Sequence, residues 1–249
     1  MNVLLTGGAN GIGESTAYKF AKAGHNVFIV DMDSRGQEVA DNIAQENTNV
    51  KAWFYKADVS DSDQVTQAVA AMAKLVDGKI DVLVNNAGVS VMVNGTFPLI
   101  EQMTDDALQR QFAVNTFSMY YMCRAVVPYM KAAKSGCIVN VASLAVFGLA
   151  ASSHYSGSKG AVEALSRSLA VELAPDIQVI GIAPGLVDTI LTSQASESVK
   201  NKFTSQTLTG KFINRWEVAN QIVHFANPDN ASFTGQIVHF NAGHTRQFK

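Results

Sequence analysis

Residues 6–13 read Thr-Gly-Gly-Ala-Asn-Gly-Ile-Gly and stand directly between a short apolar run and a helical pattern. A glycine-rich turn in that position presents backbone N–H groups and the positive end of a helix, which together can hold a diphosphate. Gly7 permits the tight turn, Gly11 lets the chain approach the phosphates, and Gly13 lets helix and strand pack closely. The turn therefore predicts a nucleotide site, with a ligand-free glycine turn as the alternative.

Short apolar runs alternate with longer helical patterns along the rest of the chain. The expected strands are residues 3–5, 26–30, 50–57, 80–84, 137–141, 177–182 and 236–240. The first expected helix follows the glycine turn and ends at residue 23. Further helices are expected over residues 33–46, 61–76, 104–131, 153–173 and 215–226. Continuous apolar strands are buried on both faces, and their alternation with helices gives right-handed βαβ units in one parallel sheet.

We therefore expect an α/β fold with a single doubly wound (Rossmann) domain over residues 1–249. Its seven-stranded, mostly parallel sheet would carry helices on both faces. Residues 188–214 are polar with weak periodicity, and we expect them to form a loop with short helices that holds the substrate. A closed eight-stranded barrel is the rival fold, but seven strands and the glycine turn disfavour it.

Composition excludes several classes of protein. The chain has 249 residues, and its 47% hydrophobic content excludes disorder. A net charge of −2 argues against a dedicated nucleic-acid binder, which would carry a basic surplus. The start, Met-Asn-Val-Leu-Leu-Thr, has no signal-peptide pattern, and no apolar run approaches the ~18 residues of a membrane span. We expect a cytoplasmic protein.

The two cysteines, Cys123 and Cys137, stand among apolar residues, and the sequence has no Cys/His cluster. A disulfide framework and a zinc site are therefore both disfavoured, and no motif requires a metal. We expect both thiols to be buried in a reducing compartment.

Asp31 ends the second expected strand, 18 residues after Gly13. A carboxylate there accepts hydrogen bonds from the adenosine ribose diol. It also repels a 2′-phosphate, by at most about 4 kcal/mol per unit charge at ~4 Å and an effective dielectric of ~20. No Arg or Lys occupies position 10 or 32, and Arg35 is the only basic residue nearby. NAD is therefore favoured over NADP, unless Asp31 merely caps the following turn.

Further motifs follow the glycine turn in order. They are Asp58-Val59, Asn85-Asn86-Ala87-Gly88, Asn115, Ser143, Tyr155-Ser-Gly-Ser-Lys159, Pro184-Gly185 with Val187 and Thr189, and the C-terminal Phe233-Thr-Gly-Gln-Ile with Asn-Ala-Gly243. In type and spacing they resemble the short-chain dehydrogenase/reductase family over essentially the whole chain. The resemblance implies that a dinucleotide is held by Gly7, Asn10, Gly11, Ile12, Gly13, Asp31, Asp58, Val59, Asn86, Ala87, Gly88, Tyr155, Lys159, Pro184, Gly185, Val187 and Thr189.

Tyr155 and Lys159 are four residues apart at a helix start, so their side chains share a face. A tyrosine with a pKa near 10 is a poor base, but a neighbouring ammonium and a nicotinamide cation favour the phenolate and are expected to lower that pKa. Such a tyrosine exchanges a proton with a hydroxyl or carbonyl oxygen. The resemblance further implies that Ser143 holds the substrate oxygen, that Lys159 binds the nicotinamide ribose, and that Asn115 holds a proton-relaying water.

Each of these four residues could also have a purely structural role. Tyr155 and Lys159 could form a surface pair, and Ser143 and Asn115 could cap turns. Their joint occurrence favours catalysis.

The substrate is specified least well. The resemblance assigns its pocket to three stretches, which follow Gly88, follow Ser143 and span 186–210. Their apolar residues are Val91, Met92, Val93, Leu144, Val146 and Phe147. Such a wall suits a lipophilic or alicyclic alcohol or ketone. We expect Ser143, Phe147, His154 and Tyr155 to contact the substrate, with Gln194 as a further polar candidate.

The sequence thus favours an NAD-dependent oxidoreductase that interconverts a secondary alcohol and a ketone. A 3-oxoacyl-carrier-protein reductase using NADPH is the first alternative. Asp31 opposes it, and Asp176 is acidic where such reductases often carry a base. A non-catalytic dinucleotide-binding regulator is the second, although such proteins typically lose the tyrosine or lysine. The resemblance also implies a homotetramer, formed partly through helices 105–131 and 153–174.

Overall fold

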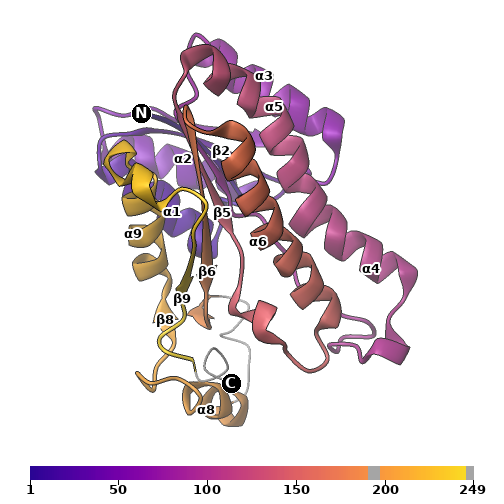
Figure 1. The fold of residues 1–249 in the computed structure, drawn as a ribbon. Coiled ribbons are helices and arrows are strands. Elements are labelled where there is room, and N and C mark those ends of the chain that lie inside the picture. The colour runs from indigo at the N-terminus through magenta and orange to yellow at the C-terminus, as the bar shows by residue number, and fades with distance from the viewer. Residues whose placement is uncertain (190–196, 245–249) are drawn as a thin grey trace.

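In the computed structural model, residues 1–189 and 197–244 are described. Within them, seven parallel strands form one sheet in the order β3-β2-β1-β4-β5-β6-β9 (Figure 1). The strands are β1 (Asn2–Thr6), β2 (Asn26–Asp31), β3 (Ala52–Lys56), β4 (Val82–Asn85), β5 (Gly136–Val141), β6 (Ile177–Pro184) and β9 (Ile237–Phe240). The expected doubly wound α/β fold is confirmed.

Helices cover both faces of the sheet, as expected. The α-helices of the described residues are α1 (Gly11–Lys22), α2 (Arg35–Glu46), α3 (Ser62–Leu75), α4 (Asp105–Phe112), α5 (Ser118–Ala133), α6 (Ser153–Leu173), α9 (Arg215–Phe225) and, beyond the end of the sheet, α8 (Glu197–Thr204) (Figure 1). Figure 1 shows α1 and α9 to the left of the sheet and α5 and α6 to its right. None of the helices in the described part of the chain is long and apolar enough to cross a membrane.

Alternate residues of each strand enter opposite cores because successive strand side chains point to opposite faces. Leu4 of β1 packs into the core formed with α3, α5 and α6. Val3 and Leu5, its neighbours, pack into the core formed with α1, α2 and α9. Both faces of the central strands are therefore buried, which explains their continuous apolar runs.

The strand order reverses between β1 and β4, which are adjacent in the sheet. In open α/β sheets, ligands bind outside the carboxyl ends of the strands at such a switch point. The glycine turn after β1 and the Asn85–Gly88 motif at the end of β4 flank this point.

The single helix expected over residues 104–131 is divided. α4 ends at Phe112, a π-helical turn occupies Ala113–Phe117, and α5 continues from Ser118. A π-helical turn holds one extra residue and occurs mostly at functional sites. Here it contains Asn115, whose side-chain contacts compensate for the irregular backbone (below).

The described part of the segment after β6 contains a short helix, as expected, and a strand pair that the sequence did not predict. β7 (Val187–Asp188) pairs with β8 (Ile213–Asn214), and α8 lies between them in sequence. Val187 and Ile213 are buried against the α9 side of the core. Strands of two residues are too short to leave an alternation that a sequence pattern would reveal.

Candidate active site

The glycine turn is closed to side chains at two of its positions. A Cβ on Gly13 would lie 1.9 Å from the Gly7 carbonyl oxygen, so only glycine fits there. Gly7 has a φ of +70°, and a Cβ there would lie 2.8 Å from the Ala87 Cα. Asn10, the exposed N-cap residue of α1, makes no capping hydrogen bond through its side chain within the described residues. The first-turn N–H groups of α1 are therefore available to an anion.

The turn is tied to the end of β4 by Thr6 and Asn86. The Thr6 hydroxyl accepts hydrogen bonds from the backbone N–H groups of Asn86 and Ala87, both at 3.1 Å. The Asn86 side-chain amide donates to the carbonyls of Thr6 (3.1 Å) and Gly7 (3.0 Å). These bonds hold the two halves of the switch point together, so the Asn86 side chain shapes the cradle.

Asp31 is held beside the same turn. Its carboxylate accepts hydrogen bonds from the backbone N–H groups of Ala9 (2.9 Å) and Asp33 (3.0 Å). Arg35, the base nearest in sequence, donates to the Asp33 carboxylate through Nε (2.9 Å) and a terminal nitrogen (2.5 Å). A fixed carboxylate thus lies at the end of β2, next to a cation that is already paired.

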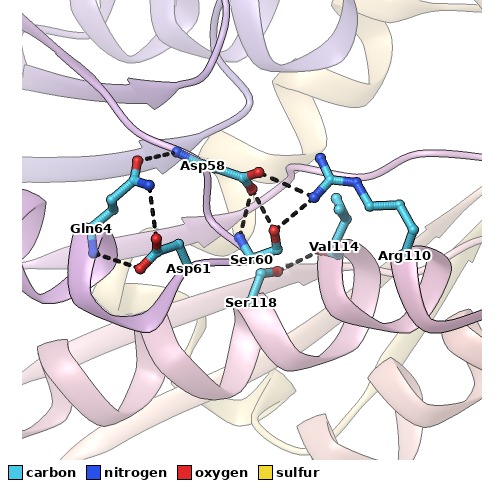
Figure 2. Close-up of polar contacts among 7 residues, drawn as sticks. All are labelled: Asp58, Ser60, Asp61, Gln64, Arg110, Val114 and Ser118. Atoms are coloured by element: carbon cyan, nitrogen blue, oxygen red, sulfur yellow. Dashed lines mark hydrogen bonds and ion pairs between the residues drawn. The ribbon is translucent and has the colours of Figure 1, made fainter. Parts of the chain in front are cut away.

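Asp58 follows β3 and belongs to a polar network with α4 (Figure 2). Its carboxylate accepts from the Ser60 backbone N–H (2.9 Å), the Ser60 hydroxyl (2.6 Å) and Arg110 (3.1 Å). Arg110 also donates to the Ser60 hydroxyl at 2.8 Å. Burial opposes ionisation, but the Ser60 hydrogen bonds and the Arg110 guanidinium together hold the pKa of Asp58 below its usual value. Sequence reasoning missed Arg110, and Val59 is buried in the core.

The four predicted catalytic residues come from three elements. Ser143 follows β5, Tyr155 and Lys159 lie in the first turns of α6, and Asn115 lies in the π-helical turn. The Ser143 side chain is close enough to the Tyr155 phenol to lower the pKa of that phenol. A Cβ on Gly88 would lie 3.3 Å from Lys159 Nζ and 3.4 Å from Asn115 Oδ1. The tetrad and the end of β4 therefore form one cluster.

The two ionisable groups of this cluster have shifted pKa values. Burial raises the pKa of the Tyr155 phenol, and the nearby Ser143 side chain only partly opposes that rise. The net shift in the protein alone is therefore upward, opposite to the lowering that the sequence predicts for Tyr155 beside an ammonium and a nicotinamide cation. Burial also lowers the pKa of Lys159 to about 8. Lys159 is only 4% exposed, and its Nζ donates to the Val141 carbonyl at 2.7 Å.

Asn115 holds the segment that follows β4. Its Oδ1 accepts from the Val89 N–H (2.8 Å), and its Nδ2 donates to the Val89 carbonyl and to the Ser158 hydroxyl, both at 3.0 Å. Thr116 donates to the Ser158 carbonyl at 3.1 Å. The π-helical turn is thus fastened to both the loop after β4 and α6.

The residues predicted from the motif after β6 lie opposite the glycine turn. A Cβ on Gly11 would lie 3.7 Å from Thr189 Cγ2, so that motif and the start of α1 are in contact range. Pro184 ends β6, Gly185 follows it, and Val187 is buried. The side chain of Ile12 packs against the core on the α1 side.

The predicted substrate residues differ in exposure. Phe147 is exposed, with its ring 4.9 Å from the His239 ring. His154 is buried, and its Nε2 lies 2.9 Å from the Val91 carbonyl oxygen. Leu144 is buried in the core rather than open to a ligand. Gln194 lies outside the described residues.

No group of three or more His, Cys, Asp or Glu side chains in the described residues has the arrangement of a metal site. Cys123 and Cys137 are buried as expected, and burial raises the pKa of each thiol to about 12. A thiol with so high a pKa is a poor nucleophile.

These features fit a dinucleotide. The cradle admits no Cβ at Gly7 or Gly13, the start of α1 faces it, and a fixed carboxylate stands at the end of β2. Fold and site together define the class of nicotinamide-dinucleotide-binding oxidoreductases with a doubly wound sheet. The sequence model described as short chain dehydrogenase matches residues 1–200. The chain belongs to the short-chain dehydrogenase family, and it is an oxidoreductase that acts on CH–OH and keto groups.

Individual relatives differ in what their names say. A 3-oxoacyl-acyl-carrier-protein reductase from Thermotoga maritima is 32% identical over 244 residues, 96% of each chain. A cyclopentanol dehydrogenase from Comamonas sp. is 34% identical over 236 residues, 93% of this chain and 91% of its own. The solved structure named ElxO with NADP bound has a TM-score of 0.89 and 28% identity, covering 100% of this chain and 99% of its own.

Proposed function

We propose that this protein is an NAD-dependent oxidoreductase that interconverts a secondary alcohol and a ketone on a lipophilic or alicyclic small molecule. The observation that carries the proposal is the fixed position of Asp31 at the end of β2, in a chain that also gathers Asn115, Ser143, Tyr155 and Lys159.

The preference for NAD follows from the charges around Asp31. Each of its carboxylate oxygens accepts one backbone hydrogen bond and has lone pairs left for a ribose diol. A 2′-phosphate would meet Asp31 and Asp33 together. Arg35 would have to give up its hydrogen bonds to Asp33 before it could bind that phosphate.

The remaining cofactor contacts are proposed from position in the cradle. The diphosphate would lie over Gly7, Asn10, Gly11, Ile12 and Gly13, with the adenine end towards Asp58 and Val59. The nicotinamide half would lie among Asn86, Ala87, Gly88, Tyr155, Lys159, Pro184, Gly185, Val187 and Thr189. Bound in this way, the cofactor supplies or accepts the hydride.

The chain's own residues transfer the proton to or from the substrate oxygen. Tyr155 gives its phenolic proton to the ketone oxygen or takes one from the alcohol, and Ser143 hydrogen-bonds the same oxygen. The raised pKa of Tyr155 keeps the phenol protonated at neutral pH, which suits the acid role in ketone reduction. Lys159, with a pKa of about 8, can replace that proton near neutral pH, next to Asn115.

The substrate pocket is proposed to lie between the loop after β4 and the segment after Ser143, closed by residues within 188–214. Exposed Met92 and Phe147 supply apolar surface there. Such a wall suits a neutral alicyclic or lipophilic substrate. Cofactor and substrate would thus share one domain.

A 3-oxoacyl-carrier-protein reductase using NADPH is the second candidate. It is favoured by the named activity of the 32% identical relative and by the NADP-bound structural neighbour. The two candidates differ in cofactor and in substrate, so one experiment separates them.

That experiment titrates NADH and NADPH into dialysed protein by nicotinamide fluorescence, then assays cyclopentanol oxidation and acetoacetyl-coenzyme A reduction. NADH binding at least tenfold tighter (about 1.4 kcal/mol), with cyclopentanol turnover, supports the first candidate. Tighter NADPH binding with thioester reduction supports the second. Absence of binding by either cofactor overturns both.

We also propose a homotetramer. Phe117 in the π-helical turn, Tyr120 on α5 and Val171 on α6 are large apolar side chains exposed on the helical segments expected to pair. Light scattering at micromolar concentration tests this proposal, and a particle of monomer mass would contradict it.

A further inference from the structure

The backbone of residues 89–91 is held by side chains from two helices. The side-chain amide of Gln111 on α4 accepts from the Val91 N–H (2.9 Å) and donates to the Val89 carbonyl (2.7 Å). His154 at the start of α6 approaches the Val91 carbonyl with Nε2 at 2.9 Å. Val91 is thus bonded on its N–H side by α4 and on its carbonyl side by α6.

The side chains of Gln111 and His154 are both buried and form hydrogen bonds to the backbone of residues 89–91. Gln111 is 0% exposed although glutamine is usually a surface residue, and both ends of its amide are satisfied. His154 is 3% exposed. A carbonyl only accepts, so Nε2 carries the hydrogen, while the buried Nδ1 has no partner in the described residues. Neither side chain directs a polar atom to solvent, whereas a polar residue that only interacts with water would do so.

The position of this contact links it to the cluster around Tyr155. His154 directly precedes Tyr155, and Gln111 stands one helical turn before Asn115. The Val89–Val91 backbone therefore passes between the start of α6 and the helix that carries Asn115. Met92, the next residue, is exposed.

We propose that Gln111 and His154 are positioning residues that fix residues 89–91 as one wall of the substrate pocket. The proposal rests on the proposed function. Neither residue touches reacting atoms in this role. They act through Val91, whose place decides how a substrate lies against Tyr155. We refer to the three residues as the Val91 clasp.

The contacts predict which property the clasp controls. Val89 is also held by Asn115, so it keeps two hydrogen bonds without Gln111, whereas the Val91 N–H loses its bond. The end of β4 and the glycine turn are held together separately, by hydrogen bonds of Asn86 and Ala87 with Thr6 and Gly7. Loss of Gln111 is therefore expected to disturb the substrate wall and to leave the cofactor cradle in place.

The test compares Gln111→Leu with Gln109→Leu, the same change at an exposed position of the same helix. We expect Gln111→Leu to raise the KM for cyclopentanol at least tenfold while the Kd for NADH changes less than twofold. Hydrogen exchange, followed by mass spectrometry, is expected to accelerate at least tenfold in the peptide containing Val91. Gln109→Leu is expected to match the unchanged protein in all three measurements.

Gln111→Glu supplies a second variant with its own signature. A protonated glutamic acid reproduces both hydrogen bonds of the amide, but the carboxylate faces the Val89 carbonyl with a second acceptor. Burial favours the protonated form. The ratio of the KM of Gln111→Glu to the KM of the unchanged protein is therefore expected to fall towards one as the pH is lowered from 8.5 to 6. The same ratio for Gln111→Leu is expected to stay constant.

The outcomes distinguish failure of the proposed function from failure of the Val91 clasp. If the unchanged protein turns over neither cyclopentanol nor acetoacetyl-coenzyme A, the proposed function is overturned and the clasp's role with it. If the unchanged protein is active and Gln111→Leu keeps its KM and its exchange rate at Val91, the clasp alone is overturned. A parallel loss of NADH affinity would also contradict it. If Gln111→Leu does not fold, the pH dependence of Gln111→Glu decides.

Discussion

Arg110 of α4 donates a hydrogen bond of 3.1 Å to the carboxylate of Asp58, which lies 52 positions earlier at the end of β3 (Figure 2). The bond connects the strand whose end would receive the adenine to the helix that leads into the π-helical turn. The next residue, Gln111, contacts the loop after β4, and Asn115 contacts both that loop and α6. One helical segment thus reaches both ends of the proposed cofactor site.

Arg110→Gln is expected to weaken NADH binding about threefold to tenfold, or about 0.7–1.4 kcal/mol. The effect is modest because both side chains of the ion pair are partly exposed to solvent. The binding difference between NADH and its hypoxanthine analogue is expected to shrink, because Asp58 would no longer be held for the adenine amino group. Arg124→Gln is the control, since Arg124 donates a hydrogen bond to Ser62 in the same region. An unchanged adenine preference in Arg110→Gln would refute this link.

Tyr155→Phe is expected to lower kcat by about 10²–10⁴-fold, the usual contribution of a general acid or base. The Kd for NADH is expected to remain within twofold, because the cradle around the glycine turn is held by Thr6 and Asn86 and the other proposed cofactor contacts are retained. Tyr129→Phe provides the matched loss of a hydroxyl at a half-buried position on α5. Turnover that survives in Tyr155→Phe would show that another group moves the proton.

Asp31→Asn is expected to reduce the preference for NADH over NADPH about tenfold. The amide keeps the size of the side chain but removes the charge that opposes a 2′-phosphate. Asp41→Asn, on the exposed face of α2, controls for the loss of one carboxylate. Fluorescence titrations of the two reduced cofactors against each variant measure the ratio. An unaltered ratio would remove Asp31 as the selecting residue.

Lys159 predicts a specific dependence of stability on pH. Below pH 8 the lysine is protonated in both the folded and the unfolded chain, so the cost of burying the ammonium is fully present. Between about 8 and 10.5 the unfolded chain binds more protons, and the free energy of unfolding rises with pH. The full difference corresponds to about 3 kcal/mol.

Urea unfolding of the unchanged protein and of Lys159→Met at several pH values checks this expectation. The difference in unfolding free energy between the two proteins is the useful quantity, because both retain Cys123 and Cys137, whose raised pKa values act in the opposite direction above about pH 9. We expect the difference to favour Lys159→Met at pH 7 and to decline by pH 10. A difference that does not vary with pH would contradict a lowered pKa of Lys159 in the folded protein.

Much of the fold could be predicted because its determinants are local. The continuous apolar runs gave all seven strands of the sheet within a few residues, and the helix expected at 153–173 spans Ser153–Leu173. The glycine turn was informative for the same reason, since its geometry depends on the residues within it. The catalytic residues were selected by family resemblance, and the structure brings them together.

What could not be predicted depends on contacts between distant residues. The bond from Arg110 to Asp58 and the bonds from Gln111 to Val89 and Val91 exist only once α4 lies beside the segments that follow β3 and β4. The spacing of four between Gln111 and Asn115 placed both on one helical face, which is the signal that could have marked Gln111. The π-helical turn was missed because five residues are too few to distinguish its period from that of an α-helix.

The π-helical turn sets the rotational phase between α4 and α5. Each residue of a helix turns the chain by about 100°, so one deleted residue within Ala113–Phe117 would rotate one helix against the other by that angle. Either Met122 and Val126 would leave the core, or Arg110 and Gln111 would lose their partners. The segment can therefore accept substitutions far more readily than a change in length, because its residue count keeps packing and the candidate site in register.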